Sequence, residues 1–198
     1  MGKIALTQLT SLDGVMQSPG HGDVPFKYRG WAVDFDAGPE ADRFKLEEAQ
    51  NAEALLLGRV TYEAMQGFWP TAEGEFADRL NELPKYVISS TLTDPSWNAT
   101  VLGDDWPVVV ARLRKELDGD IVVYGSRRLS QSLIEMGLVD ELRLMVYPVV
   151  LGAGARLFGE TPDKIPMRLV ESRPLGSGVV IMIYAPAVNE SSADPGGR

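Results

Sequence analysis

Two glycine turns carry the chemistry that this sequence can be expected to perform. The first glycine turn, residues 58–63, follows an apolar run and reads Gly-Arg-Val-Thr-Tyr-Glu. The second glycine turn, residues 124–129, follows another apolar run and reads Tyr-Gly-Ser-Arg-Arg-Leu. Each pattern predicts a strand that ends in a turn and opens a helix, which leaves backbone N–H groups and the positive end of a helix dipole free to bind an anion. Two such turns in one small domain indicate a ligand with several phosphates, as in a nucleotide cofactor.

The side chains of the first glycine turn suit this interpretation. Gly58 permits a close approach of the ligand to the backbone, and Arg59 supplies a fork of charged donors. Thr61 adds a hydroxyl in the first helical turn. The residues of this turn therefore favour phosphate as the bound group.

Length and composition set the remaining limits. A chain of 198 residues suits one domain, predicted over residues 1–186, and the small polar segment 187–198 is predicted to be disordered. No run of about 18 apolar residues predicts a membrane span, and the absence of cysteine excludes disulfides and thiolate metal sites. His21, the only histidine, has no metal-binding partners in the sequence, so no metal site is expected. The net charge of −9 opposes nucleic-acid binding, and a cytoplasmic location is expected.

The elements that position these turns follow from hydrophobic periodicity. Apolar runs before each glycine turn predict buried strands, and stripes at helical spacing predict intervening helices. Residues 167–173 and 178–184 predict a final antiparallel pair. The long segment 16–38 is rich in Gly, Pro and Asp and predicts a functional loop that shapes a substrate pocket. The fold class is therefore α/β, with a mainly parallel central sheet and an antiparallel C-terminal edge hairpin.

With these residues placed, the chain resembles the dihydrofolate reductase-like superfamily. It is most similar to bacterial proteins related to the C-terminal reductase domain of the bifunctional riboflavin-biosynthesis enzyme. The resemblance is carried by five stretches in family order, residues 11–15, 55–63, 87–90, 122–129 and 137–152. It implies a three-layer α/β/α domain that binds NADPH across the C-terminal edge of its sheet.

The resemblance also implies which residues hold the cofactor. Those expected to contact NADPH are Gly58, Arg59, Thr61, Ser89, Ser90, Gly125, Ser126, Arg127 and Leu129. Ser126 stands where relatives often carry a second glycine. Arg59, Ser89 and Ser90 together favour NADPH over NADH, because the additional 2′-phosphate needs charged and hydroxyl donors.

Two carboxylates are predicted as catalytic residues, either as proton source or as substrate anchor. Asp13 follows the first strand, beside the expected nicotinamide pocket. Asp42 lies in the first helix, 17 positions before Arg59 (59 − 42), which is the spacing of the substrate-binding acid in dihydrofolate reductases. No Pro-Trp pair precedes Asp42, which argues against true folate reduction. A carboxyl group in a semi-apolar pocket has a raised pKa and can deliver or relay a proton.

The function implied is an NADPH-dependent reduction of a small heterocyclic substrate. The resemblance points to 5-amino-6-(5-phosphoribosylamino)uracil reduction in riboflavin biosynthesis. A dihydrofolate- or pterin-type reductase and a non-catalytic NADP(H)-binding protein are the alternatives. Relatives often form homodimers, and the apolar residues 146–151 suit either a dimer interface or a core strand.

Overall fold

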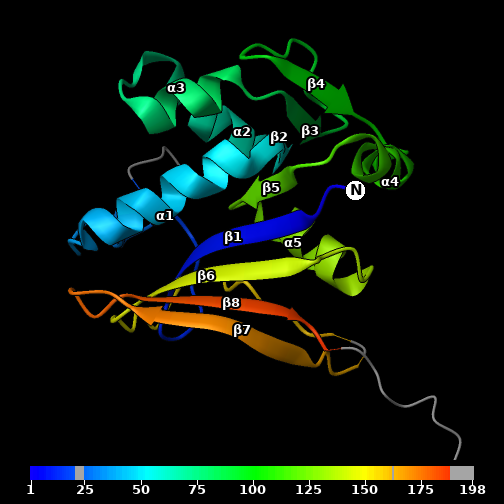
Figure 1. The fold of residues 1–198 in the computed structure, drawn as a ribbon. Helices are drawn as coiled ribbons and strands as arrows, with labels where there is room; N and C mark the ends of the chain where they lie inside the picture. The colour runs from blue at the N-terminus through cyan, green and yellow to red at the C-terminus, as the bar shows by residue number, and fades with distance from the viewer. Residues whose placement is uncertain (21–24, 162, 188–198) are drawn as a thin grey trace, which may run out of the picture.

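The computed structural model describes residues 1–20, 25–161 and 163–187. It contains one eight-stranded sheet in the order β4-β3-β2-β5-β1-β6-β8-β7 (Figure 1). The predicted tail beyond residue 187 and the expectation for His21 lie outside these ranges.

Six strands of the sheet are parallel, and the last two form the predicted antiparallel edge. The parallel strands are β1 (Ile4–Ser11), β2 (Ala52–Gly58), β3 (Lys85–Ile88), β4 (Ala99–Leu102), β5 (Asp120–Tyr124) and β6 (Glu141–Tyr147). Strand β8 (Val180–Pro186) runs antiparallel to β6 and to the edge strand β7 (Met167–Pro174). The predicted fold class is confirmed.

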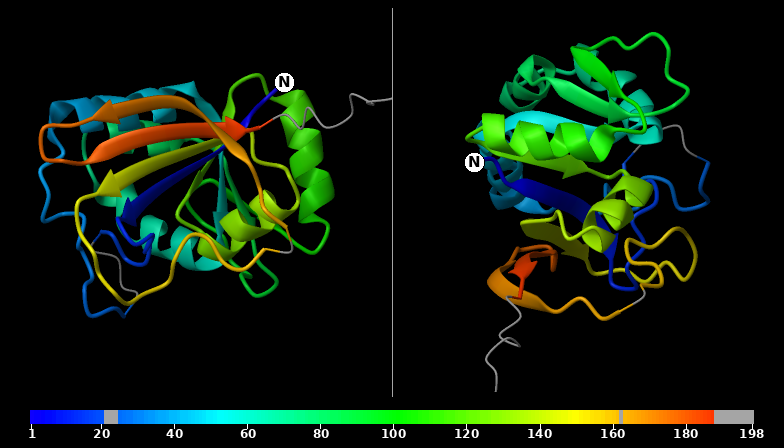
Figure 2. Two further views of the ribbon diagram at one scale, coloured as in Figure 1. Left: turned by 90° about the horizontal axis from the view of Figure 1, so that it is seen from below. Right: turned by 90° about the vertical axis from the view of Figure 1, so that its right-hand side faces the viewer.

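Helices cover both faces of the parallel part of the sheet (Figures 1 and 2). The helices are α1 (Gly38–Asn51), α2 (Arg59–Gln66), α3 (Glu75–Glu82), α4 (Trp106–Glu116) and α5 (Arg127–Glu135), with a short 3₁₀ helix η1 (Trp69–Thr71). Right-handed crossovers that run in opposite directions along a sheet place their helices on opposite faces. Helices α1, α2 and α3 therefore pack on one face, and α4 and α5 pack on the other.

Apolar periodicity explains why these segments fold as they do. The α4–α5 face buries Leu113 and Leu133 against Leu6 and Val123. On the α1 face two separate apolar groups form, one around Leu57 and Leu80 and the other around Phe44, Trp31 and Tyr147. Residues 146 and 147 belong to β6, whereas Val150 in the following loop is 68% exposed. None of the helices in the described residues is long and apolar enough to cross a membrane.

Candidate functional site

The centre of the C-terminal edge lies between β1 and β5. These strands are neighbours, and Thr7 pairs with Tyr124. The chain leaves β1 towards β2 over one face and leaves β5 towards β6 over the other face. Loops that leave neighbouring strands in opposite directions open a crevice at the strand ends, where open α/β sheets bind their ligands.

Both glycine turns lie at the C-terminal ends of neighbouring strands, β2 and β5, where each opens a helix as predicted. Gly58 is the residue before α2, and Gly125 and Ser126 precede α5, both with left-handed backbone (φ +55° and +53°). Neither helix has an acidic residue in its first turn or a side-chain cap for its N–H groups. Both helix starts therefore keep the positive potential that attracts an anion.

The two turns are hydrogen-bonded to each other. The N–H of Gly58 donates to Oγ of Ser126 at 2.9 Å, and the N–H of Ser126 donates to Oγ1 of Thr61 at 2.9 Å. Four predicted cofactor residues, Gly58, Thr61, Gly125 and Ser126, thus come together although the two turns are more than 60 positions apart in the chain.

The remaining predicted cofactor residues surround this junction in different ways. Arg59 opens α2, where its guanidinium contacts both carboxylate oxygens of Glu63 at 2.9 Å. Arg127 opens α5, where its Nε donates to the backbone oxygen of Arg156. Leu129 is 7% exposed and packs in the core, so its side chain supports α5 and presents little surface to a ligand.

Ser89 and Ser90 follow β3, whose last residue, Ile88, pairs with Gly58. The hydroxyl oxygen of Ser89 accepts the N–H groups of Thr91 and Leu92 and so closes its own turn. Ser90 is exposed. The serine pair therefore lies at the same edge as the first glycine turn.

Asp13 ties two loops together at the end of β1. Its carboxylate accepts the hydroxyl of Ser11 at 2.7 Å and the N–H groups of Leu151 and Gly152 at 3.1 and 3.0 Å, and it pairs with Arg156. The hydrogen bond from Ser11 and those from the two backbone amides lower the pKa of Asp13 from 3.8 to about 2. The raised pKa expected for a proton donor is therefore not found at Asp13, whose carboxylate is ionised at neutral pH.

Asp42 is exposed on α1. The buried stripe of this helix comprises Ala41, Phe44, Glu48 and Ala49, and Asp42 lies outside it. The structure therefore does not bring Asp42 together with Asp13 in a semi-apolar pocket, and its role stays a prediction.

Sequence reasoning missed a polar cluster beneath α1, formed by Thr7, Lys45, Glu48, Tyr124 and Arg143. Glu48 is 3% exposed and receives the Thr7 hydroxyl at 2.6 Å and the Lys45 ammonium at 3.1 Å. Arg143 lies 3.6 Å from Glu48 and pairs with Asp120 and Glu141. Tyr124 of this cluster also packs against the apolar group around Leu57 and Leu80.

Tyr124 forms the edge of this cluster nearest to the second glycine turn. Its ring lies 5.0 Å from the Lys45 ammonium, and its buried hydroxyl has no hydrogen-bond partner among the described residues. Burial, reinforced by the charge of Glu48, raises the pKa of Tyr124 well above 10.0. Tyr124 is therefore neutral at pH 7, with its hydroxyl buried.

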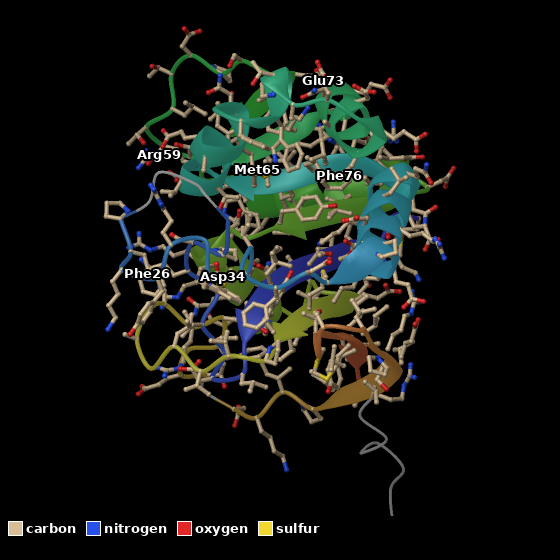
Figure 3. The ribbon with its side chains drawn as sticks, turned by 90° about the vertical axis from the view of Figure 1, so that its left-hand side faces the viewer. Phe26, Asp34, Arg59, Met65, Glu73 and Phe76 are labelled. Carbon is tan, nitrogen blue, oxygen red and sulfur yellow. The ribbon has the colours of Figure 1, made fainter. Side chains whose placement is uncertain are left out.

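A cavity of about 470 Å³ opens beside this edge, between the loop after β1 and the loop after β6. Figure 3 shows the same side of the molecule, with Arg59 above the loop residues Phe26 and Asp34. The residues that line the cavity are mostly aromatic, cationic or aliphatic: Lys27, Tyr28, Arg29, Trp31, Asp34, Phe35, Val149, Val150 and Leu151. Trp31 and Phe35 both meet the ring of Tyr147 edge-on, which fixes the aromatic wall.

Within the described part of the chain, no group of three or more His, Cys, Asp or Glu residues could hold a metal ion. The donors at the crevice are backbone N–H groups, hydroxyls and guanidinium groups. This donor set fits an anionic organic cofactor.

Known structures with the same architecture define the class of the fold. A putative riboflavin biosynthesis protein from Shewanella sp. PV-4 matches with a TM-score of 0.76 and 17% identity, over 94% of this chain and 99% of that one. Dihydrofolate reductase from Enterococcus faecalis, complexed with NADP(H) and RAB-propyl, matches with a TM-score of 0.63 and 17% identity, over 94% and 98%. The protein therefore has a dihydrofolate reductase-like α/β fold.

The family follows from the sequence comparison. The RibD C-terminal domain matches residues 2–181, and the chain belongs to this family. The uncharacterized protein YyaP of Bacillus subtilis (strain 168) is 32% identical over 137 residues, which cover 67% of this chain and 73% of YyaP. Membership of this family supports a reductase-like function, as the sequence predicted.

Proposed function

We propose that the protein is an NADPH-dependent reductase of a small heterocyclic compound. The observation that carries the proposal is the junction of the two glycine turns, where two helix N-termini without acidic residues in their first turns meet beside the β1–β5 crevice. An anion with several phosphates satisfies both helix starts at once. The dinucleotide reported in the Enterococcus faecalis dihydrofolate reductase complex is consistent with this choice.

The proposed contacts divide between the two ends of the cofactor. The N–H groups that open α2 and α5, with Arg127, hold the pyrophosphate. Arg59, Ser89 and Ser90 hold the 2′-phosphate, which distinguishes NADPH from NADH. When bound, the reduced nicotinamide supplies the hydride.

The residues of this chain provide orientation and shelter from water. The cavity is lined by the rings of Tyr28 and Phe35, which suit a planar substrate. Asp13 holds the Val149–Leu151 wall of this cavity through its bonds to Leu151 and Gly152. We propose that Asp13 positions this wall of the substrate pocket, whereas a catalytic role for Asp42 stays a prediction from its spacing in the sequence.

Titration calorimetry with NADPH and NADH tests cofactor binding, and loss of nicotinamide absorbance with pyrimidine and pterin compounds tests turnover. We expect tighter binding of NADPH and reduction of a pyrimidine related to the riboflavin pathway. Binding without turnover across the panel would favour the non-catalytic alternative, and reduction of pterins alone would favour the pterin-type reductase. The absence of binding by either dinucleotide would refute the proposal.

A further inference from the structure

The loop after β6, residues 149–157, connects two parts of the candidate site. Its first three residues line the cavity, and its last two lie against α5. Helix α5 holds this end of the loop at two points. Nε of Arg127 donates to the backbone oxygen of Arg156 at 2.9 Å, and Nε2 of Gln131 donates to the backbone oxygen of Leu157 at 2.9 Å. We call residues 149–157 the wall loop.

Arg156 joins the wall loop to the end of β1. Its Nε donates to the backbone oxygen of Asp13 at 2.8 Å, and its Nη2 lies 3.4 Å from the Asp13 carboxylate. The backbone of Arg156 also pairs with that of Val15 in an isolated antiparallel bridge. One residue therefore contacts α5 through its backbone oxygen and the loop after β1 through its guanidinium and its backbone.

Asp13 carries this connection back to the cavity. Its Oδ1 accepts the N–H of Leu151 at 3.1 Å, and its Oδ2 accepts the N–H of Gly152 at 3.0 Å. Leu151 is one of the residues that line the cavity. The contacts therefore form a continuous chain from Arg127 through Arg156 and Asp13 to the cavity wall.

The other end of this chain of contacts has donors to spare. Arg127 is exposed at the start of α5. Among the described residues only its Nε finds an acceptor, so both of its Nη groups keep their N–H donors. An anion that binds these donors also restrains the guanidinium whose Nε holds the wall loop.

We infer that Arg156 is a positioning residue that fixes the Leu151–Gly152 part of the cavity wall relative to the second glycine turn. This inference rests on the proposed function, which places the cofactor at that turn and the substrate in the cavity. A cofactor phosphate held by Arg127 restrains the wall loop through Arg156, so the cavity wall is more ordered when the cofactor is bound. Such ordering serves hydride transfer, which needs both ligands in a fixed relative position.

The test follows amide hydrogen exchange of Leu151 and Gly152 in the full chain, without ligand and with saturating NADPH. Arg156→Met keeps an unbranched side chain and removes the guanidinium donors. Arg112→Met is the matched control, because Arg112 is 66% exposed on α4 and pairs with Glu116 on the same helix. Calorimetry gives the NADPH affinity of each protein, and the amides of the β7–β8 pair report any general loss of stability.

Without ligand, we expect the Leu151 and Gly152 amides to exchange about fivefold faster in Arg156→Met than in wild type, as for the loss of one hydrogen bond. NADPH should slow these amides in wild type and in Arg112→Met and leave them unchanged in Arg156→Met. The affinity of Arg156→Met for NADPH should stay within about twofold of wild type, because the Arg127 side chain is retained.

A second variant tests whether Arg156 acts through Asp13. Asp13→Asn weakens the bonds to the Leu151 and Gly152 amides directly, so adding Arg156→Met should change their exchange little further. A full additional effect would show that Arg156 acts on the wall by another route and would overturn the inference.

Three other outcomes are decisive. Unchanged exchange in ligand-free Arg156→Met, or equal slowing by NADPH in this variant and in wild type, would overturn the inference. Faster exchange throughout the variant, with the β7–β8 amides included, would show general destabilisation and would also overturn it. A wild type that binds no NADPH would contradict the proposed function, whereas the comparison of the ligand-free proteins would still decide whether Arg156 positions the wall.

Discussion

The hydroxyl of Thr7 donates to the carboxylate of Glu48 at 2.6 Å and so joins the central strand β1 to helix α1. Both side chains are almost completely buried. The Glu48 carboxylate also forms ion pairs with the Lys45 ammonium and the Arg143 guanidinium, so one carboxylate connects β1, α1 and β6. A buried carboxylate is compatible with folding only when its charge is paired and hydrogen-bonded, as it is here.

We predict that Glu48→Gln lowers the free energy of unfolding by about 3 kcal/mol, because removing one partner leaves buried cations less well compensated. Urea unfolding followed by circular dichroism measures the change. Glu47→Gln is the control, since Glu47 is exposed on the same helix and its loss should have little effect. Equal losses for the two variants would show that the cluster does not stabilise the fold.

The ionised carboxylate of Asp13 predicts a loss of stability in acid. Its folded pKa of about 2 lies below the ordinary value of 3.8, so the stabilisation is complete above pH 4 and disappears as the pH falls from about 4 to about 2. Asp13→Asn should be less stable than wild type at pH 6, and the difference should shrink across this interval. Unfolding curves at a series of pH values provide the measurement, and a constant difference at every pH would contradict the assignment.

The elements and the two glycine turns could be predicted because they depend on local patterns. Apolar runs, helical spacing and glycine positions specify strands, helices and turns that the fold then brings to one edge. The burial of Glu48 was also readable, since it stands seven positions after Ala41 and four after Phe44 on the same helical stripe. Because a glutamate is rarely fully buried, this spacing by itself does not predict the polar cluster around Glu48.

The role of Asp13 could not be predicted in the same way. Its partners Leu151 and Gly152 lie 138 and 139 positions further along the chain. No local feature of the sequence indicates which loop will lie at the end of β1. The Asp-Gly dipeptide alone therefore does not predict that the Asp13 carboxylate accepts several hydrogen bonds. Asp42 remains a prediction from spacing, because its exposed side chain has no neighbour in the structure that reveals a role.

A third prediction concerns Lys85, whose side chain is fully buried at the start of β3. Its ammonium group donates to the backbone oxygen of Asn81 at 3.1 Å and lies 4.0 Å from the centre of the Trp97 ring. Burial lowers the pKa of Lys85 from 10.5 to about 8. The unfolded chain therefore binds this proton more tightly than the folded protein does.

Stability should consequently rise as the pH increases from about 8 towards 10.5, because unfolding takes up a proton in this range. Lys85→Met should abolish the rise and increase stability at pH 7 by up to about 3 kcal/mol. The control is Lys115→Met at an exposed position of α4. Thermal unfolding at pH 7, 8, 9 and 10 checks the prediction, which fails if both variants keep the slope of the wild type.

The pair formed by Arg59 and Glu63 yields the last prediction. The guanidinium of Arg59 is held by both oxygens of Glu63 one helical turn away, and both side chains are more than 40% exposed. An exposed pair of this kind contributes little to stability, so it can open for a ligand at low cost. A phosphate at the start of α2 then competes with Glu63 for the same guanidinium.

Arg59→Ala should therefore weaken NADPH more than NADH, by about tenfold or more, because a charge-assisted contact to the 2′-phosphate is lost. Glu63→Gln should have the opposite effect and bind NADPH severalfold more tightly, since Arg59 is released and a negative charge near the phosphate is removed. Calorimetric titration of each variant with both dinucleotides measures these changes. Equal weakening of NADPH and NADH binding in Arg59→Ala would indicate that the guanidinium contacts the pyrophosphate, which both dinucleotides share, and not the 2′-phosphate. Unchanged affinity for both dinucleotides in both variants would show that Arg59 does not contact the cofactor.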